Sequence, residues 1–262
     1  MFKIHPLYSS SSGNLFHIES NKTNILIDAG VTYKAINEGL SSINRNISDI
    51  SAVFITHEHT DHIKGLPILC KKNNIPIYAC GKTAEYLYDL MKEKNIKADI
   101  NQISYGQAVK INDIELLPFE TSHDAVMPCG YRIKCDNKTL TYATDLGYVS
   151  ENVFENLKYS DFIVLEANYD EAMLDFGKYP YELKRRIKGN FGHLSNIESA
   201  NTIAKLSKEN ENINFVMAHL SENNNNMALA KATIESVLKE NDVKEENIFF
   251  ATKTLSNEGY EI

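Results

Sequence analysis

Short apolar runs rich in β-branched residues dominate the start of the chain, and such runs are typical of buried strands. They cover Phe2–Tyr8, Leu15–Ile18 and Asn24–Asp28, and the hydroxyl-rich turn Ser9–Asn14 separates the first two. Because three closely spaced strands precede any long helical pattern, the chain is predicted to begin as an antiparallel sheet. A nucleotide-binding βαβ unit is not expected, since the sequence contains neither a Gly-x-Gly-x-x-Gly nor a Walker A pattern.

Helical periodicity appears next and then alternates with further strands. Apolar residues at helical spacing predict helices over four segments, namely Thr32–Leu40, Ile63–Lys72, Lys82–Lys94 and Met227–Glu240. A capping-box spacing between Ser195 and Glu198 predicts the start of another helix. Apolar strands are predicted at Ile50–Ile55, Ile75–Ala79, Ile114–Phe119, Cys129–Cys135, Thr139–Ala143, Phe162–Ala167 and Phe215–Ala218. The pattern therefore indicates an α/β protein.

Composition and charge limit the class of protein and the number of domains. The chain has 262 residues, 43% of them hydrophobic and 24% charged, which is ordinary for a globular protein with a full core. We expect one domain over residues 1–262. The net charge of −8 argues against broad, non-specific nucleic-acid binding, although it leaves room for a local basic patch.

The cysteines and the apolar segments bear on the compartment. The four cysteines show no Cys-x-x-Cys spacing, so we interpret them as free thiols of a reducing cytosol and not as metal ligands. The segment Met1–Pro6 lacks the apolar core of a signal peptide. No apolar run approaches the ~18 residues that a membrane helix needs. We therefore expect a cytoplasmic protein without a membrane partner.

The densest chemistry lies in Thr56–His62, directly after the predicted strand Ile50–Ile55. This stretch holds three imidazoles and two carboxylates, the ligand types of zinc and similar divalent metals. Its alternation can direct His57 and His59 to one point and Asp61 and His62 to a neighbouring point, which suits two metals. The alternative is a polar surface turn, which the density of ligands at a strand end disfavours.

Three more ligand-type residues stand at, or a few residues beyond, the ends of predicted strands. His123 follows Ile114–Phe119, Asp145 follows Thr139–Ala143, and His219 follows Phe215–Ala218. Any one of them alone would usually be a satisfied structural polar residue. Together with His57, they predict one site at one edge of a sheet sandwich.

In this order, the His-x-His-x-Asp-His motif and the three later residues resemble the metallo-β-lactamase-fold superfamily, and the resemblance covers nearly the whole chain. It implies an αβ/βα sandwich, in which two mixed β-sheets lie face to face and helices flank them. It also implies two divalent ions, Zn²⁺ or Mn²⁺. The implied ligands are His57, His59 and His123 for the first ion, Asp61, His62 and His219 for the second, and Asp145 as the bridge.

Other motifs narrow the branch. Asp145 stands where true β-lactamases carry Cys, and the Gly-His pattern that usually follows the third ligand of glyoxalase-type members is missing. Phosphodiesterases of the superfamily have an extra His before the last ligand, and His193 in Gly-His-Leu-Ser-Asn is similar in position. The resemblance assigns catalysis to Asp61 and His193, with His193 assisting the leaving oxygen. The alternative is a His that only caps a helix.

The serine-rich opening and the Gly-His-Leu-Ser-Asn motif together resemble the YycJ/WalJ-type branch of the superfamily. This branch implies a 5′-to-3′ exonuclease on DNA, in which a hydroxide held between two metal ions attacks phosphorus.

Two segments are candidates for substrate binding. The turn residues Ser11, Ser12 and Asn14 can hydrogen-bond a terminal phosphate, or form a plain surface turn. The basic residues Lys184, Arg185 and Arg186 can hold a nucleic-acid backbone, or form a solvated helix face. Three tyrosines are candidates for stacking on an unpaired terminal base, namely Tyr169, Tyr179 and Tyr181.

Three other functions remain open at this point. The first is a small-molecule, cyclic phosphodiesterase of the PhnP type, which the basic segment disfavours. The second is a thioester hydrolase, which the missing Gly-His pattern disfavours. The third is a catalytically silent metal-binding or scaffold protein, which the complete set of seven ligand positions disfavours.

Overall fold

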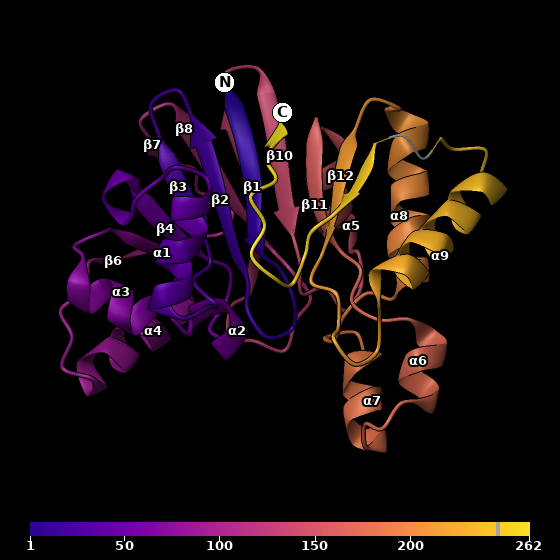
Figure 1. Cartoon of the computed structure of the whole chain (residues 1–262), viewed down its shortest axis with the longest axis horizontal. Helices are drawn as coiled ribbons and strands as arrows, with labels where there is room; N and C mark the ends of the chain where they lie inside the picture. The colour runs from indigo at the N-terminus through magenta and orange to yellow at the C-terminus, as the bar shows by residue number, and fades with distance from the viewer. Residues whose placement is uncertain (245–246) are drawn as a thin grey trace.

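A computed structural model describes residues 1–244 and 247–262 (Figure 1). This part of the chain forms two seven-stranded sheets that lie face to face. The strand order of the first sheet is β14 (Tyr260–Glu261), β1 (Phe2–Tyr8), β2 (Leu15–Ser20), β3 (Asn24–Ile27), β4 (Ala52–Ile55), β5 (Ile77–Cys80) and β6 (Ile100–Ile103). The order of the second sheet is β13 (Ile248–Phe250), β12 (Asn214–Ala218), β11 (Phe162–Glu166), β10 (Lys138–Ala143), β9 (Cys129–Cys135), β8 (Ile114–Glu120) and β7 (Val109–Ile111).

Helices cover the outer face of each sheet. The first sheet packs against α1 (Tyr33–Ser42), α3 (Leu66–Lys72) and α4 (Gly81–Glu93), and the second against α5 (Glu151–Lys158), α8 (Asn196–Glu209) and α9 (Met227–Glu240). The remaining short helices are η1 (Ile47–Asp49), α2 (Thr60–Ile63), α6 (Glu171–Phe176) and α7 (Tyr181–Ile187). The predicted αβ/βα sandwich of two mixed sheets is thus confirmed.

The central strands are apolar on both faces because each sheet lies between the other sheet and a layer of helices. Every residue of β4 and β11 is buried. Phe54 on β4 points into the space between the sheets, where its ring meets the Tyr131 ring edge-on at a centroid distance of 5.6 Å. Its neighbour Val53 belongs instead to the core beneath the helices of the first sheet.

Strand direction brings the carboxyl ends of many strands to one edge of the sandwich. Strands β3 to β6 run parallel, as do β10 to β13. Strand β8 runs in the same direction as β10, because both pair antiparallel with β9. In Figure 1 this edge carries α2, and α6 and α7 project beyond it. Sites in α/β sheets commonly form outside such carboxyl ends.

The helix predicted over Ile63–Lys72 differs from the observed structure. The segment forms two helices, α2 and α3, with Gly65 between them. A Cβ atom at Gly65 would lie 2.2 Å from the Val31 carbonyl oxygen, so the break allows two backbones to approach closely. Helices α5 and α6 follow no pattern identified in the sequence.

Two further expectations can be compared with the structure. All four cysteines are buried and free. Within residues 1–244 and 247–262, no helix is both long and apolar enough to cross a membrane.

Candidate metal centre

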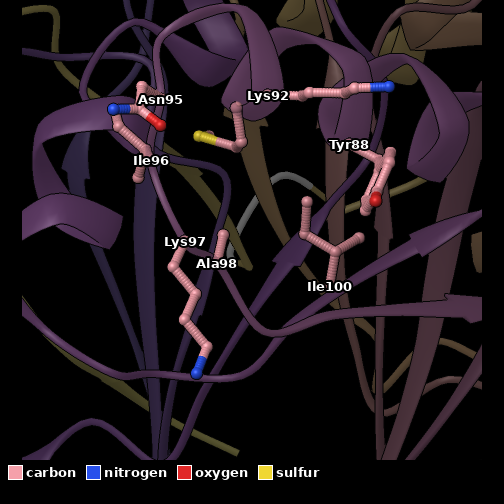
Figure 2. A pocket seen from close by; sticks show the side chains of 8 residues that line it. Tyr88, Lys92, Asn95, Ile96, Lys97, Ala98 and Ile100 are labelled. Atoms are coloured by element: carbon pink, nitrogen blue, oxygen red, sulfur yellow. The ribbon is translucent and has the colours of Figure 1, made fainter.

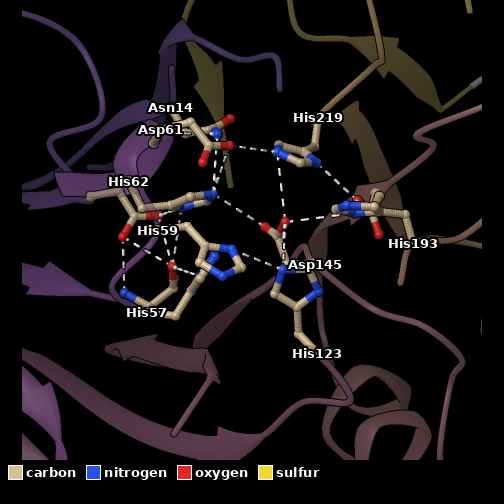
Figure 3. A network of polar contacts seen from close by, with 12 residues as sticks. Asn14, His57, His59, Asp61, His62, His123, Asp145, His193 and His219 are labelled. Carbon is tan, nitrogen blue, oxygen red and sulfur yellow. Dashed lines mark hydrogen bonds and ion pairs between the residues drawn. The ribbon is translucent and has the colours of Figure 1, made fainter. Parts of the chain in front are cut away.

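The ends of strands β3, β4, β8, β10, β11 and β12 bring side chains to one point at the sandwich edge (Figure 3). Three of the residues that follow these strands have a left-handed backbone, with φ of 63° at Asp28, 59° at Asp145 and 58° at His219. This conformation costs roughly 1–3 kcal/mol for a residue other than glycine, and it clusters at functional sites. It turns each side chain sharply away from the direction of its strand.

The first group of potential ligands is His57, His59 and His123, whose ligand atoms lie within 4.8 Å of one another. The His59 Nδ1 and His123 Nε2 atoms are 3.3 Å apart. His57 is buried, and its Nε2 atom has no hydrogen-bond partner within the described part of the chain. Buried polar atoms without partners are rare, so this nitrogen is fit to bind a cation.

The second group is Asp61, His62 and His219, again with ligand atoms within 4.8 Å of one another. The Asp61 Oδ2 atom lies 3.4 Å from His62 Nε2 and 3.3 Å from His219 Nε2. Asp61 and His62 belong to α2, which begins directly after His59. The start of α2 therefore lies between His59, which belongs to the first group, and Asp61 and His62, which belong to the second.

Asp145 lies between the two groups. Its Oδ1 atom is 3.7 Å from His123 Nε2 in the first group and 3.6 Å from His219 Nε2 in the second. Its Oδ2 atom lies 3.4 Å from His62 Nε2 and makes no hydrogen bond among the described residues. The structure thus brings together all seven residues that the sequence singled out as ligands.

Buried acceptors on the far side of the imidazoles fix their orientation. Asp28 accepts a hydrogen bond of 2.7 Å from His62 Nδ1, and Glu166 accepts one of 2.9 Å from His219 Nδ1. The Gly192 carbonyl accepts from His123 Nδ1 at 3.0 Å. Each contact leaves Nε2 free to face the centre, as the outer partners of metal-bound histidines do.

Sequence reasoning missed the roles of Asp28 and Glu166. Both side chains are fully buried. Each is the single acid in or directly after an otherwise apolar strand run, Ile25–Ile27 for Asp28 and Phe162–Leu165 for Glu166. A lone acid in such a run is the pattern that could have identified them, because a buried carboxylate needs a partner.

His193 shares the carboxylate of Glu166 with His219. Its Nδ1 atom lies 2.7 Å from Glu166 Oε1 and 3.7 Å from Asp145 Oδ1. The predicted helix start at Ser195 is confirmed, and the Ser195 hydroxyl caps α8 by accepting from the Glu198 amide. His193 therefore does not serve as the cap, and its partly exposed ring stands beside the ligand groups.

The charges around the centre shift the pKa values of its imidazoles in opposite directions. Burial lowers the pKa of His57, and the neighbouring imidazoles lower it further. Burial also acts on His62 and His219, but the carboxylates around them prevail and raise the pKa of His62 well above its usual value and that of His219 to about 10. Despite burial, the surrounding imidazoles lower the pKa of Asp145. Burial instead raises the pKa of Asp28, although His62 acts against this shift. The lowered pKa of Asp145 favours its ionised form, whose negative charge favours cations between the two groups.

The predicted phosphate-binding turn lies next to this centre. Asn14 is buried, and its side-chain amide donates to the Ser10 carbonyl and lies 3.3 Å from His62 Nε2. Ser12 is exposed and donates to Glu222 at 2.5 Å. Ser11 is exposed and makes no side-chain hydrogen bond among the described residues.

The predicted basic segment forms α7, and its three cations have different partners. The Lys184 ammonium donates to the Asp175 and Gly177 carbonyls at the end of α6. Arg186 forms an ion pair with Asp124, which follows His123 directly. Arg185 is exposed and has no ion pair within residues 1–244 and 247–262.

The three candidate stacking tyrosines also differ. The stacking role predicted for Tyr169 is wrong, because its side chain is 4% exposed. Tyr179 accepts a hydrogen bond from Asn223, while Tyr181 is 72% exposed and available for contact.

A separate surface pocket of about 410 Å³ opens between the end of α4 and β6 (Figure 2). Its lining holds no His, Cys, Asp or Glu among the described residues, so it offers no metal ligands. The lining residues are Tyr88, Met91, Lys92, Asn95, Ile96, Lys97, Ala98 and Ile100.

Comparisons with known proteins agree with this arrangement. Residues 23–213 match the family model described as the Beta-lactamase superfamily domain. The chain is 37% identical to exodeoxyribonuclease YycJ of Bacillus anthracis over 89% of this chain and 88% of that protein. It is 36% identical to exodeoxyribonuclease WalJ of Streptococcus pneumoniae over 92% and 90%. The crystal structure of the metallo-β-lactamase fold protein YhfI from Bacillus subtilis superposes with a TM-score of 0.74 at 16% identity, covering 99% and 98%.

Proposed function

Since the chain belongs to the metallo-β-lactamase superfamily, and within it to the family of YycJ and WalJ, we propose that it is a metal-dependent DNA exonuclease. The observation that carries the proposal is the position of Asp145 between two three-residue ligand groups, with His193 beside it. Both relatives named exodeoxyribonuclease match this chain over about nine-tenths of their own length, 88% and 90%.

The donor set fits two divalent ions. His57, His59 and His123 would hold one, Asp61, His62 and His219 the other, and Asp145 would serve both. The unpartnered His57 Nε2 and Asp145 Oδ2 atoms support this assignment. Nitrogen and carboxylate oxygen donors suit Zn²⁺ and Mn²⁺ alike.

Two ions in such a site stabilise charge on the phosphate oxygens and acidify the attacking water. The residues of the chain supply orientation and a proton. In its doubly protonated form, His193 would donate Nδ1–H to Glu166 and the Nε2 proton to the leaving oxygen. Asp61 is partly exposed, at 23% of its side chain, and its charge faces the open side of the centre.

DNA contacts follow from the surroundings of the centre. Arg185, which has no ion pair among the described residues, offers its cation to the phosphate backbone. Ser11 offers a hydroxyl to a terminal phosphate, and Ser12 can do so on release of its hydrogen bond to Glu222. Two exposed aromatic residues, Tyr148 at 47% and Phe191 at 64%, follow Asp145 and precede His193. They suit stacking on an unpaired base at a strand end.

The two loops that carry these aromatic residues are in backbone contact. A Cβ atom at Gly147 would lie 2.6 Å from the Phe191 nitrogen, so the two loops touch. The Ser122 hydroxyl and the Tyr148 backbone also exchange hydrogen bonds of 2.9 and 3.1 Å. The loops that carry Asp145 and His193 thus form one rim.

The compartment and the domain organisation are parts of the same proposal. The four free, buried cysteines suit the reducing cytoplasm. Residues 1–262 are proposed to act as one domain, because a single core of side chains from both sheets connects them. One cooperative transition in urea, seen identically by fluorescence and circular dichroism, is the expected result.

The test is digestion of linear DNA that carries a label at its 5′ end, with Mn²⁺, using wild type and Asp145→Ala. We expect wild type to release labelled mononucleotides first, and Asp145→Ala to be slower by a factor of about 10³ or more, because both ligand groups lose a shared carboxylate. The control is Asp89→Ala, an exposed acid on α4. Hydrolysis of bis(4-nitrophenyl) phosphate without any release from DNA would overturn the exonuclease in favour of a small-diester enzyme.

A further inference from the structure

Two histidines outside the centre face each other across the first pair of strands. His5 on β1 and His17 on β2 are directly opposite in the antiparallel register, and their ring centroids are 5.5 Å apart. Glu19 lies two residues beyond His17 and therefore on the same face of the sheet. The three side chains offer ligand atoms within 4.8 Å of one another.

The surroundings hold this cluster away from water. His17 has no exposed surface, and Glu19 is 6% exposed. The backbone of the C-terminal segment lies over His5, since a Cβ atom at Gly259 would be 2.3 Å from the His5 Cε1 atom. Arg45 donates two hydrogen bonds to Glu19 Oε2, at 2.9 and 2.6 Å. The other oxygen, Oε1, faces His5 Nε2 at 3.5 Å.

Three of the four imidazole nitrogens of the cluster have no hydrogen-bond partner within the described part of the chain. Asn24 accepts a hydrogen bond from His17 Nε2 at 3.0 Å, which leaves His17 Nδ1 as an acceptor. Within the described residues, His17 Nδ1 and both ring nitrogens of His5 are buried without a hydrogen-bond partner. Each buried polar atom left unsatisfied costs about 1–3 kcal/mol, so a group that binds them would stabilise the fold.

We propose that His5, His17 and Glu19 form a zinc site that is separate from the metal centre at the sheet edge. Two imidazoles and a carboxylate are a known zinc ligand set, in which a water molecule can fill the fourth position. Asn24 fixes the His17 ring in the manner of an outer partner of a bound histidine. Burial lowers the pKa of both imidazoles, which keeps them neutral and able to bind a metal.

The position of the cluster assigns the ion a structural role. It would clamp β1 to β2 through His5 and His17. Through Arg45 on Glu19, it would also connect this hairpin to the segment that follows α1. All three ligands lie within paired strands, and His17 and Glu19 are buried.

The test counts zinc by mass spectrometry after the protein is saturated with Zn²⁺ and freed of excess. We expect His5→Gln to hold one zinc fewer per chain than wild type, and to keep its hydrolysis of bis(4-nitrophenyl) phosphate. The control is Lys110→Gln, an exposed residue of β7, which should hold as much zinc as wild type. Equal zinc in His5→Gln and wild type overturns the proposal and favours an ion pair between protonated His5 and Glu19.

A second measurement needs no variant. Anomalous diffraction at the zinc edge from zinc-soaked crystals of wild type should show a peak between His5 and His17. The absence of that peak, in crystals with zinc at Asp145, overturns this site while leaving the proposed function intact.

Discussion

The eight histidines of the chain fall into two buried clusters, and their surroundings differ. Six lie at the sheet edge among five carboxylates, those of Asp28, Asp61, Asp124, Asp145 and Glu166. The other two, His5 and His17, lie in mid-strand beside Glu19, whose charge Arg45 already balances. The comparison separates what burial does to an imidazole from what neighbouring carboxylates do.

The protonation of the two clusters follows from this difference. At the edge, carboxylates overcome burial at two imidazoles, since they raise the pKa of His62 well above its usual value and that of His219 to about 10. Burial still lowers the pKa of His57 and His123, which face other imidazoles. In mid-strand, burial prevails and lowers the pKa of His17 to about 4. The edge cluster has several carboxylates to share between two divalent ions, whereas the mid-strand cluster has Glu19 as its one acid, and the charge of Glu19 is paired with Arg45.

Backbone context separates the clusters further. The edge ligands follow strands, and Asp145 and His219 use a left-handed backbone to reach the centre. His5 and His17 use regular, paired strand backbone. Loops on a rigid scaffold commonly carry catalysis, while paired strands carry stability.

Among the variants that compare the two clusters, the largest effect is expected from Glu166→Gln, which removes the carboxylate that His193 and His219 share. We expect kcat on DNA to fall by about 100-fold, because the amide oxygen of Gln can still accept a hydrogen bond but carries no negative charge to stabilise the protonated His193. Steady-state kinetics checks this, with Glu155→Gln on the exposed face of α5 as the control. An unchanged kcat would show that the edge carboxylates do not set the chemistry.

The mid-strand cluster is expected to give a smaller, pH-dependent effect on stability. Between the folded pKa of His17, about 4, and its ordinary value of 6.5, the unfolded chain binds more protons than the folded chain. Stability is therefore lost as the pH falls through this window, by about 2 kcal/mol between pH 7 and pH 5 for this group.

Urea unfolding of metal-free protein at the two pH values measures this loss. His17→Asn should lose less stability than wild type over the same interval, whatever its absolute stability. Equal losses in both proteins would mean that His17 titrates normally and that burial does not govern the cluster.

The smallest effect on DNA cleavage is expected from the basic helix α7, which lies near the edge cluster. Arg185→Ala should raise KM for DNA by about threefold, because it removes one phosphate contact. It should also reduce the slope of log binding constant against log salt concentration by about one. Lys184→Ala should instead destabilise the fold by about 1 kcal/mol, since Lys184 binds the end of α6. KM values at several salt concentrations distinguish the two, and a larger salt effect of Lys184→Ala would reverse their roles.

The sequence predicted much of the centre because ligand chemistry and strand ends coincide in it. His57, His123, Asp145 and His219 each follow an apolar run, and parallel strands bring such ends to one edge. It could not predict ion pairs between residues that are far apart in the sequence, such as Arg186 with Asp124. The sequence does not show which acid a basic residue meets in the folded chain. Tyr169 was misassigned for the same reason, since its burial depends on how the loop before α6 packs.

The local break at Gly65 shows a further limit. Helical periodicity runs through this residue, and only the approach of the Val31 backbone explains why the helix is interrupted. The roles of Asp28 and Glu166 likewise depend on which imidazole each one meets across the sheets. Such contacts are set by tertiary packing.

The most direct test of this account is a titration of metal-free protein with Mn²⁺, followed by hydrolysis of bis(4-nitrophenyl) phosphate. The account predicts that activity is complete when two ions per chain occupy the edge cluster, and that His5→Gln follows the same curve as wild type. Full activity with one ion per chain, or loss of activity in His5→Gln, would contradict it.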